Sequence, residues 1–155
     1  MSRYADSTGV PVDRSKAEIE RTLDRYGATG FLYGTKAGKA MIAFEVERRH
    51  VRIMLPLPLG TDAEIERDGR NHKRTKLEIE KAVEKETRRR WRALGLVIKA
   101  KLEAVSSGIA LFDDEFLAYM VPPTGESFGE WARPQIEGLA KGGKMPALLS
   151  SGGRP

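Results

Sequence analysis

The first part of the chain shows a helical spacing of apolar residues. Ser15 followed by Glu18 three residues later fits a capping box, in which each side chain bonds the backbone N–H of the other residue. Apolar side chains then recur at i, i+4 and i+7, which is one face of a helix: Ile19, Leu23 and Tyr26. The pattern predicts a helix over residues 15–26, preceded by a flexible arm over residues 1–14.

Three short runs of β-prone residues follow, and turn-forming residues separate them. The runs cover residues 31–33, 41–46 and 51–55. In the second and third runs every other residue is apolar, which is typical of strands with one buried face. Gly38 suits a hairpin turn after the first run, and Pro56 ends the third because proline cannot donate to a sheet ladder. We predict a three-stranded antiparallel meander.

A long helix is predicted after a charged segment without periodicity. Residues 60–72 show no regular spacing of apolar side chains, and we expect a mobile surface loop there. Residues 74–105 contain no proline, and Thr75 with Glu78 repeats the capping-box pattern. An apolar stripe runs through this segment: Val83, Thr87, Trp91, Leu94, Ile98, Leu102 and Val105. Because a three-stranded sheet needs a cover for its apolar face, we expect this stripe to pack on the meander.

The C-terminal part predicts shorter helices and a tail. An amphipathic helix is expected near residues 111–121, and residues 142–155 are expected to form a flexible tail. Between them, four apolar residues indicate a short helical return that proline breaks: Phe128, Trp131, Ile136 and Leu139. The fold class is therefore α+β, with one domain over residues 15–141. An N-terminal helix and a β-meander packed on a long basic amphipathic helix are followed by short C-terminal helices.

Positive charge is concentrated in the predicted long helix. The whole chain has a net charge of +5, but residues 73–105 hold eleven bases and five acids, a net charge of +6. On a helical wheel, most of these bases fall at roughly 140–200° when Val83 is placed at zero, opposite the apolar stripe. No acid interrupts this face between Lys81 and Arg92. We expect a basic ridge facing solvent, with these candidate phosphate-binding residues: Arg74, Lys81, Lys85, Arg88, Arg89, Arg92 and Lys99.

Phosphate binding is the chemistry that such a ridge suits. Lysine offers a point charge, arginine offers a fork that matches phosphate oxygens, and each neutralised phosphate releases counterions. Two other interpretations stay open: a solvated helix face, and a surface for an acidic protein partner. Trp91 lies in the apolar stripe, so we expect it to pack in the core rather than to stack on a base.

The composition argues against catalysis. The chain has no Cys and only two His, and no arrangement of nucleophile, base and acid is recognisable. Asp113, Asp114 and Glu115 are consecutive, so we expect first-turn acids rather than a metal site. We therefore expect a protein that is not an enzyme and needs no metal or cofactor. No apolar run approaches the ~18 residues of a membrane span, and the first residues lack a signal peptide. We expect a cytoplasmic protein that does not act at a membrane.

Several short sequence segments resemble those of an uncharacterised protein family encoded by bacteriophages and prophages. They cover residues 15–20, 26–28, 55–58, 90–105, 108–109 and 129–137. The resemblance implies a location in the host bacterial cell and assigns no site residue. The order of three antiparallel strands and a long basic helix is also similar to the core of phage single-strand annealing proteins, which act as oligomeric rings. That likeness implies a homo-oligomer whose basic helix lines a nucleic-acid groove.

Two functions follow as hypotheses. The first is a phage-encoded nucleic-acid-binding protein that grips the backbone phosphates of single-stranded DNA in recombination or replication. The alternative is a counter-defence protein that sequesters a host signalling nucleotide or blocks a host defence protein. Sequestration needs an enclosed pocket, whereas binding to a strand needs an open, continuous surface.

Overall fold

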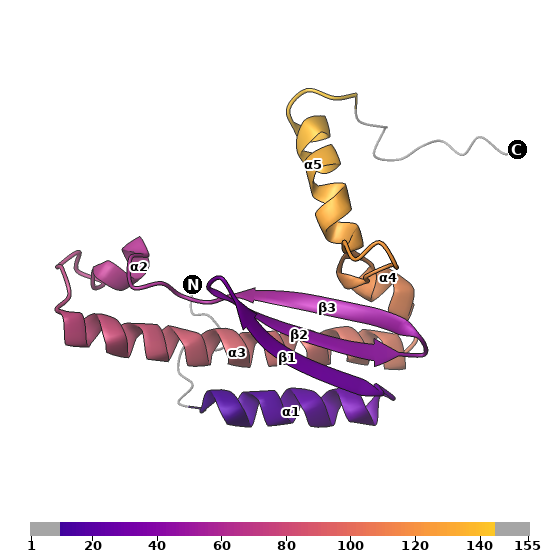
Figure 1. The fold of residues 1–155 in the computed structure, drawn as a ribbon, viewed down its shortest axis with the longest axis horizontal. Coiled ribbons are helices and arrows are strands. Elements are labelled where there is room, and N and C mark those ends of the chain that lie inside the picture. Colours follow the sequence, from indigo (N-terminus) through magenta and orange to yellow (C-terminus); the bar gives the residue numbers. More distant parts are fainter. Residues whose placement is uncertain (1–9, 145–155) are drawn as a thin grey trace, which may run out of the picture.

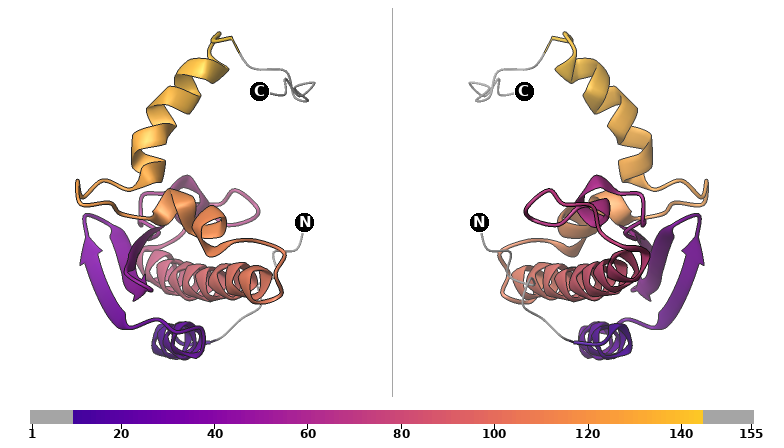
Figure 2. Two further views of the ribbon diagram at one scale, coloured as in Figure 1. Left: turned by 90° about the vertical axis from the view of Figure 1, so that its right-hand side faces the viewer. Right: turned by 90° about the vertical axis from the view of Figure 1, so that its left-hand side faces the viewer.

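The computed structural model describes residues 10–144, which form an α+β fold with helices on one face of a three-stranded sheet (Figure 1). The helices over residues 12–25 and 76–106 lie side by side on this face of the sheet, as the end-on views show (Figure 2). Along the chain the elements are α1 (Val12–Arg25), β1 (Gly30–Lys36), β2 (Lys39–Val46), β3 (Arg49–Pro56), α2 (Ala63–Glu66), α3 (Lys76–Ser106), α4 (Phe112–Phe116), the 3-10 helix η1 (Leu117–Tyr119) and α5 (Phe128–Ala140).

The predicted meander is confirmed. The strands are antiparallel in the order β1-β2-β3, and Tyr33, Ile42 and Ile53 lie opposite one another in the register. Both hairpins turn over two residues with positive φ, the backbone sense that matches the twist of the strands. In the first turn Gly38 has φ 73°, and in the second Arg48 has φ 65°.

The core lies between the sheet and the helices. Every second residue of β2 is buried, from Ala40 to Val46, and these side chains face α1 and α3. The predicted stripe of the long helix is confirmed in its C-terminal half, where Trp91 is only 4% exposed. The N-terminal end of the stripe is half-buried, because α3 runs on beyond the sheet there. The buried residues that α3 contributes to the core are Trp91, Leu94, Ile98 and Leu102.

The first helix begins earlier than the capping-box pattern predicted. It starts at Val12, with Pro11 at the N-cap position and φ −59°. Proline fixes φ near this value, so the ring sets the entry of the helix. Ser15 is buried, and its hydroxyl has no hydrogen-bond partner in the described part of the chain, so the predicted capping box is wrong. Residues 12–14 of the predicted arm belong to α1, and residues 1–9 lie outside the described region.

The segment 60–72 holds regular structure that its sequence pattern did not predict. It forms the short helix α2, in which Ile65 is buried against the body of the protein. An antiparallel bridge then joins Arg67 and Lys73. A single apolar anchor gives no periodicity, which explains why the pattern indicated only an irregular loop.

The C-terminal helices differ in two ways from expectation. The helix expected near residues 111–121 is confirmed as α4, but it tightens into η1 and ends where Met120 bridges to Val51 of β3. The predicted break at proline is wrong, because α5 runs through Pro134 as one helix. α5 projects from the body of the protein (Figures 1 and 2). Residues 145–155 of the predicted tail lie outside the described region.

Candidate nucleic-acid interface

The N-terminal part of α3 stands apart from the rest of the fold. α3 has 31 residues and is therefore about 46 Å long, and its first turns extend past α1 and the sheet on the side of α2 (Figure 1). The predicted capping box holds this end: the Glu78 N–H donates to the Thr75 hydroxyl at 3.3 Å, and the Thr75 N–H donates to the Glu78 carboxylate at 2.7 Å. The hydrogen bond from the Thr75 backbone keeps the pKa of Glu78 below its usual range. The capping box thus stabilises the end of the helix that carries the candidate bases.

Two exposed lysines and one arginine are the residues of the predicted ridge that lie close together and form no ion pair in the described region. Lys81 and Lys85 are exposed and make no ion pair within residues 10–144. Arg88 is half-buried, and its Nε is buried without a hydrogen-bond partner among the described residues. The three residues follow one another at i, i+4 and i+7, so they lie on one face at axial steps of about 6 and 4.5 Å. We name Lys81, Lys85 and Arg88 the basic triad.

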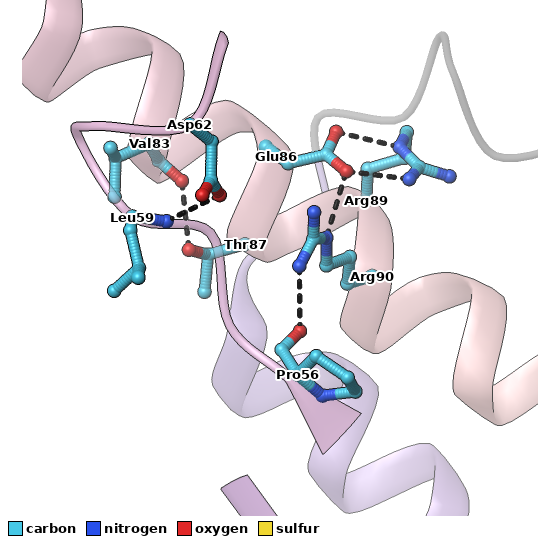
Figure 3. A network of polar contacts seen from close by, with 8 residues as sticks. All are labelled: Pro56, Leu59, Asp62, Val83, Glu86, Thr87, Arg89 and Arg90. Atoms are coloured by element: carbon cyan, nitrogen blue, oxygen red, sulfur yellow. Dashed lines mark hydrogen bonds and ion pairs between the residues drawn. The ribbon is translucent and has the colours of Figure 1, made fainter. Parts of the chain in front are cut away.

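Arg89 and Arg90 are held by one carboxylate (Figure 3). Glu86 accepts two hydrogen bonds from Arg89, at 2.7 and 2.6 Å, and one from Arg90 at 2.9 Å. Arg90 also donates to the carbonyl of Pro56 at the end of β3, at 2.8 Å. The hydrogen bonds from Arg89, together with Arg90, lower the pKa of Glu86 to about 2. This cluster fixes α3 against the end of the sheet, which is a structural role.

Arg92 and Arg74 also serve the fold. Arg92 forms an ion pair with Glu18 of α1, whereas the wheel had placed Arg92 on a solvent-facing ridge. Arg74 donates to the backbone carbonyls of Glu64 and Ile65 at 3.1 and 3.0 Å, and so holds the end of α2. The expected continuous, solvent-facing ridge is therefore wrong, because α1 packs beside α3 and brings Glu18 to Arg92.

Lys99 is the remaining predicted base. It is exposed and without an ion pair among the residues that the structure describes. It lies eleven residues after Arg88, or about 16 Å along the helix, and the Arg92–Glu18 pair lies between them. Lys99 is therefore separate from the basic triad.

Two neighbouring hollows lie between α3 and the segment 64–74. Their volumes are about 360 and 390 Å³, and they share three lining residues: Arg74, Ala82 and Lys85. His72 and Lys73 line the second hollow, and the helical wheel did not indicate them because they precede α3. Asn71 was the available signal, since asparagine tolerates the positive φ of 65° that it adopts in the turn that brings Lys73 back to Arg67.

The acidic cluster near α4 is structural. Asp113 forms an ion pair with Arg49, whose hydrogen bonds keep the pKa of Asp113 below its usual range. Glu115 accepts a hydrogen bond from Lys101 at 3.0 Å. Over residues 10–144 no three His, Asp or Glu side chains converge as a metal site would require. The same part of the chain holds no helix that is long and apolar enough to cross a membrane.

Comparisons with known proteins leave the function to be inferred from this chain alone. Protein-family models, curated proteins and solved structures were all searched, and none matches the sequence or the fold.

Proposed function

We propose that this protein binds single-stranded nucleic acid through the basic triad, with DNA in recombination or replication as its substrate. The observation that carries the proposal is the state of Lys81, Lys85 and Arg88. All three are on one helix face and lack an ion pair in the described region, whereas Arg89, Arg90 and Arg92 are held by carboxylates. Cations without a partner are the ones that can exchange counterions for phosphates.

The arrangement favours a single strand over a duplex. The triad forms one row along a projecting helix, so it can follow one phosphate backbone. Lys73 lines the hollow of about 390 Å³ beside Lys81 and Lys85, so a phosphate of the same strand can lie between these bases; Asp68 and Glu78 line the same hollow. Phosphate contacts of this kind carry no sequence information, so we expect binding with little preference among sequences. A location in the cytoplasm of a host bacterial cell fits this substrate.

The decisive experiment is fluorescence anisotropy with a labelled single-stranded oligonucleotide over a salt series. We expect affinity to fall as salt rises, with a slope in the log–log plot of roughly −0.7 for each phosphate contact. Replacing Lys81 and Lys85 together by Glu should remove most of the binding. The matched control replaces Lys36 and Lys39 by Glu, because both lie exposed at the β1–β2 turn and the change in net charge is identical.

Three results would overturn the proposal. They are an absence of binding at low salt, an affinity that does not change with salt, and an equal loss of binding in the control variant. Duplex DNA as competitor tests the preference for a single strand. Cyclic dinucleotides as competitors test whether the hollows beside Lys85 hold a nucleotide instead.

A further inference from the structure

α5 carries an apolar stripe that nothing in the described region covers. None of its 13 residues is buried. Trp131 and Ile136 are 58% and 62% exposed, and Phe128 and Leu139 are each 41% exposed. At 100° per residue these four side chains lie on one side of the helix, and the charged Glu130, Glu137 and Lys141 lie on the other.

Among the described residues, the helix is fixed near its base. Ser127 and Glu130 form a capping box, and Glu130 also bonds Arg52 of β3 at 3.0 Å. Gly129 lies against η1, where an added Cβ would be 2.7 Å from the Ala118 carbonyl oxygen. Past this first turn the helix projects away from the sheet (Figure 1).

A helix of this length and composition is unstable without packing. Pro134 lies inside it, removes one backbone hydrogen bond and crowds the preceding turn. Gly129 and Gly138 are weak helix formers, and isolated helices shorter than about 12–15 residues are marginal in water. The C-terminal half of α5 therefore needs a surface that covers its apolar stripe.

The sequence of α5 is nearly symmetric about the point between Arg133 and Pro134. Read from both ends, Phe128 matches Leu139, Gly129 matches Gly138, Glu130 matches Glu137 and Trp131 matches Ile136. In a two-fold interface residue i meets residue j of the other copy and residue j meets residue i. Because of the symmetry of the sequence, an antiparallel pair of α5 helices centred between Arg133 and Pro134 places each apolar residue of the stripe opposite another apolar residue. We propose that α5 pairs antiparallel with α5 of a second copy of this chain.

The exposed area is sufficient for such a dimer. The four stripe residues and Leu117 of η1 are on average about half exposed, which leaves on the order of 500 Å² of mostly apolar surface per copy. Two copies bury roughly 1,000 Å², the lower bound for a specific interface. A hollow of about 540 Å³ lies between η1 and the base of α5, and antiparallel pairing brings Leu139 of the second copy to it. The charged side of each helix stays in water.

Sedimentation velocity over a range of protein concentrations tests the dimer. We expect a wild-type dimer and a monomeric Trp131→Glu/Ile136→Glu variant. The matched control is Leu77→Glu/Ile109→Glu, because both residues are more than 60% exposed and lie outside the apolar stripe of α5. This control should remain a dimer. A monomeric wild-type protein, or a dimer that survives the α5 substitutions, would overturn the proposal.

Cysteine cross-linking tests the antiparallel arrangement independently of the glutamate variants. The chain has no Cys, so introduced thiols have no native competitor. A mixture of Phe128→Cys and Leu139→Cys proteins should form a mixed disulfide dimer on mild oxidation. Phe128→Cys alone should not cross-link, since its two thiols lie about 16 Å apart along the helix pair. Cross-linking of Phe128→Cys with itself, and not with Leu139→Cys, would indicate parallel helices and overturn the proposal.

Discussion

The cluster of Glu86 with Arg89 and Arg90 gives a sharp prediction for stability. Replacing Glu86 by Gln keeps the shape of the side chain and removes its charge. The Glu86 carboxyl has a pKa of about 2 in the folded protein against an ordinary value of 4.5. At ~1.36 kcal/mol per pKa unit, this shift corresponds to at most ~3.5 kcal/mol of stability. Because solvent and salt screen a pair on a helix surface, we expect a loss of ~1–2 kcal/mol at neutral pH.

The same substitution predicts a pH dependence with a definite sign. The pKa of Glu86 is lower in the folded than in the unfolded protein, so its stabilising effect is complete above about pH 5. The effect is lost as the pH falls through the range between 4.5 and about 2. The difference in unfolding free energy between wild type and Glu86→Gln should therefore shrink by about half at pH 3. Other carboxylates titrate equally in both proteins and cancel in this difference.

Urea unfolding followed by circular dichroism at pH 7 and pH 3 measures both quantities. Glu84→Gln is the matched control, because Glu84 is an exposed acid of the same helix that forms no ion pair among the described residues. It should change the unfolding free energy by less than ~0.5 kcal/mol. The reasoning is refuted if Glu86→Gln is as stable as this control at pH 7. It is also refuted if the difference between Glu86→Gln and wild type stays constant down to pH 3.

Substitutions at three positions test the packing and the proposed interface. Phe116→Ala removes a fully buried ring and should cost ~3–5 kcal/mol of unfolding free energy in urea, and a loss below ~1 kcal/mol would contradict its place in the core. At Gly95, an added Cβ lies 3.4 Å from Ile19, so Gly95→Ala should leave the midpoint of thermal unfolding unchanged or raise it. Gly95→Leu should lower this midpoint, because the larger side chain separates α1 from α3. Lys85→Glu should raise the unfolding free energy by ~0.5–1 kcal/mol, because it relieves repulsion from bases three and four residues away. The same variant should bind the labelled oligonucleotide more weakly, and a variant that is both less stable and equally tight in binding would contradict the proposal.

Local patterns predicted the elements of this fold well. Alternation in β2 and β3 and the stripe through Trp91 and Ile98 each describe one face of one element, so a linear sequence contains them. The capping box at Thr75 formed as predicted because its two partners are only three residues apart. The capping box predicted at Ser15 did not form, because the helix begins at Val12 with Pro11 as its N-cap, which places Ser15 inside the helix.

The arrangement of the elements was harder to predict. The helical wheel divided α3 into an apolar and a basic side, as if one helix alone covered the sheet. α1 shares that layer, and it brings Glu18 to Arg92 across 74 residues of sequence. No local spacing contains such a pair. The candidate site therefore shrank from seven bases to three, the exposed Lys81 and Lys85 and the half-buried Arg88.

The basic residues of α3 divide into two groups: the charges of one group stabilise the folded protein, and the charges of the other destabilise it. Arg89, Arg90 and Arg92 each lie beside a carboxylate, so their charges favour the folded state. Lys81 and Lys85 are like charges four residues apart on an exposed face, an arrangement that disfavours the helix. Helix stability does not account for Lys85, because an acid at this position would lie beside Lys81, Arg88 and Arg89. A ligand that brings negative charge to this face would remove the repulsion, which is why the proposed function rests on the unpaired lysines rather than on the more numerous arginines.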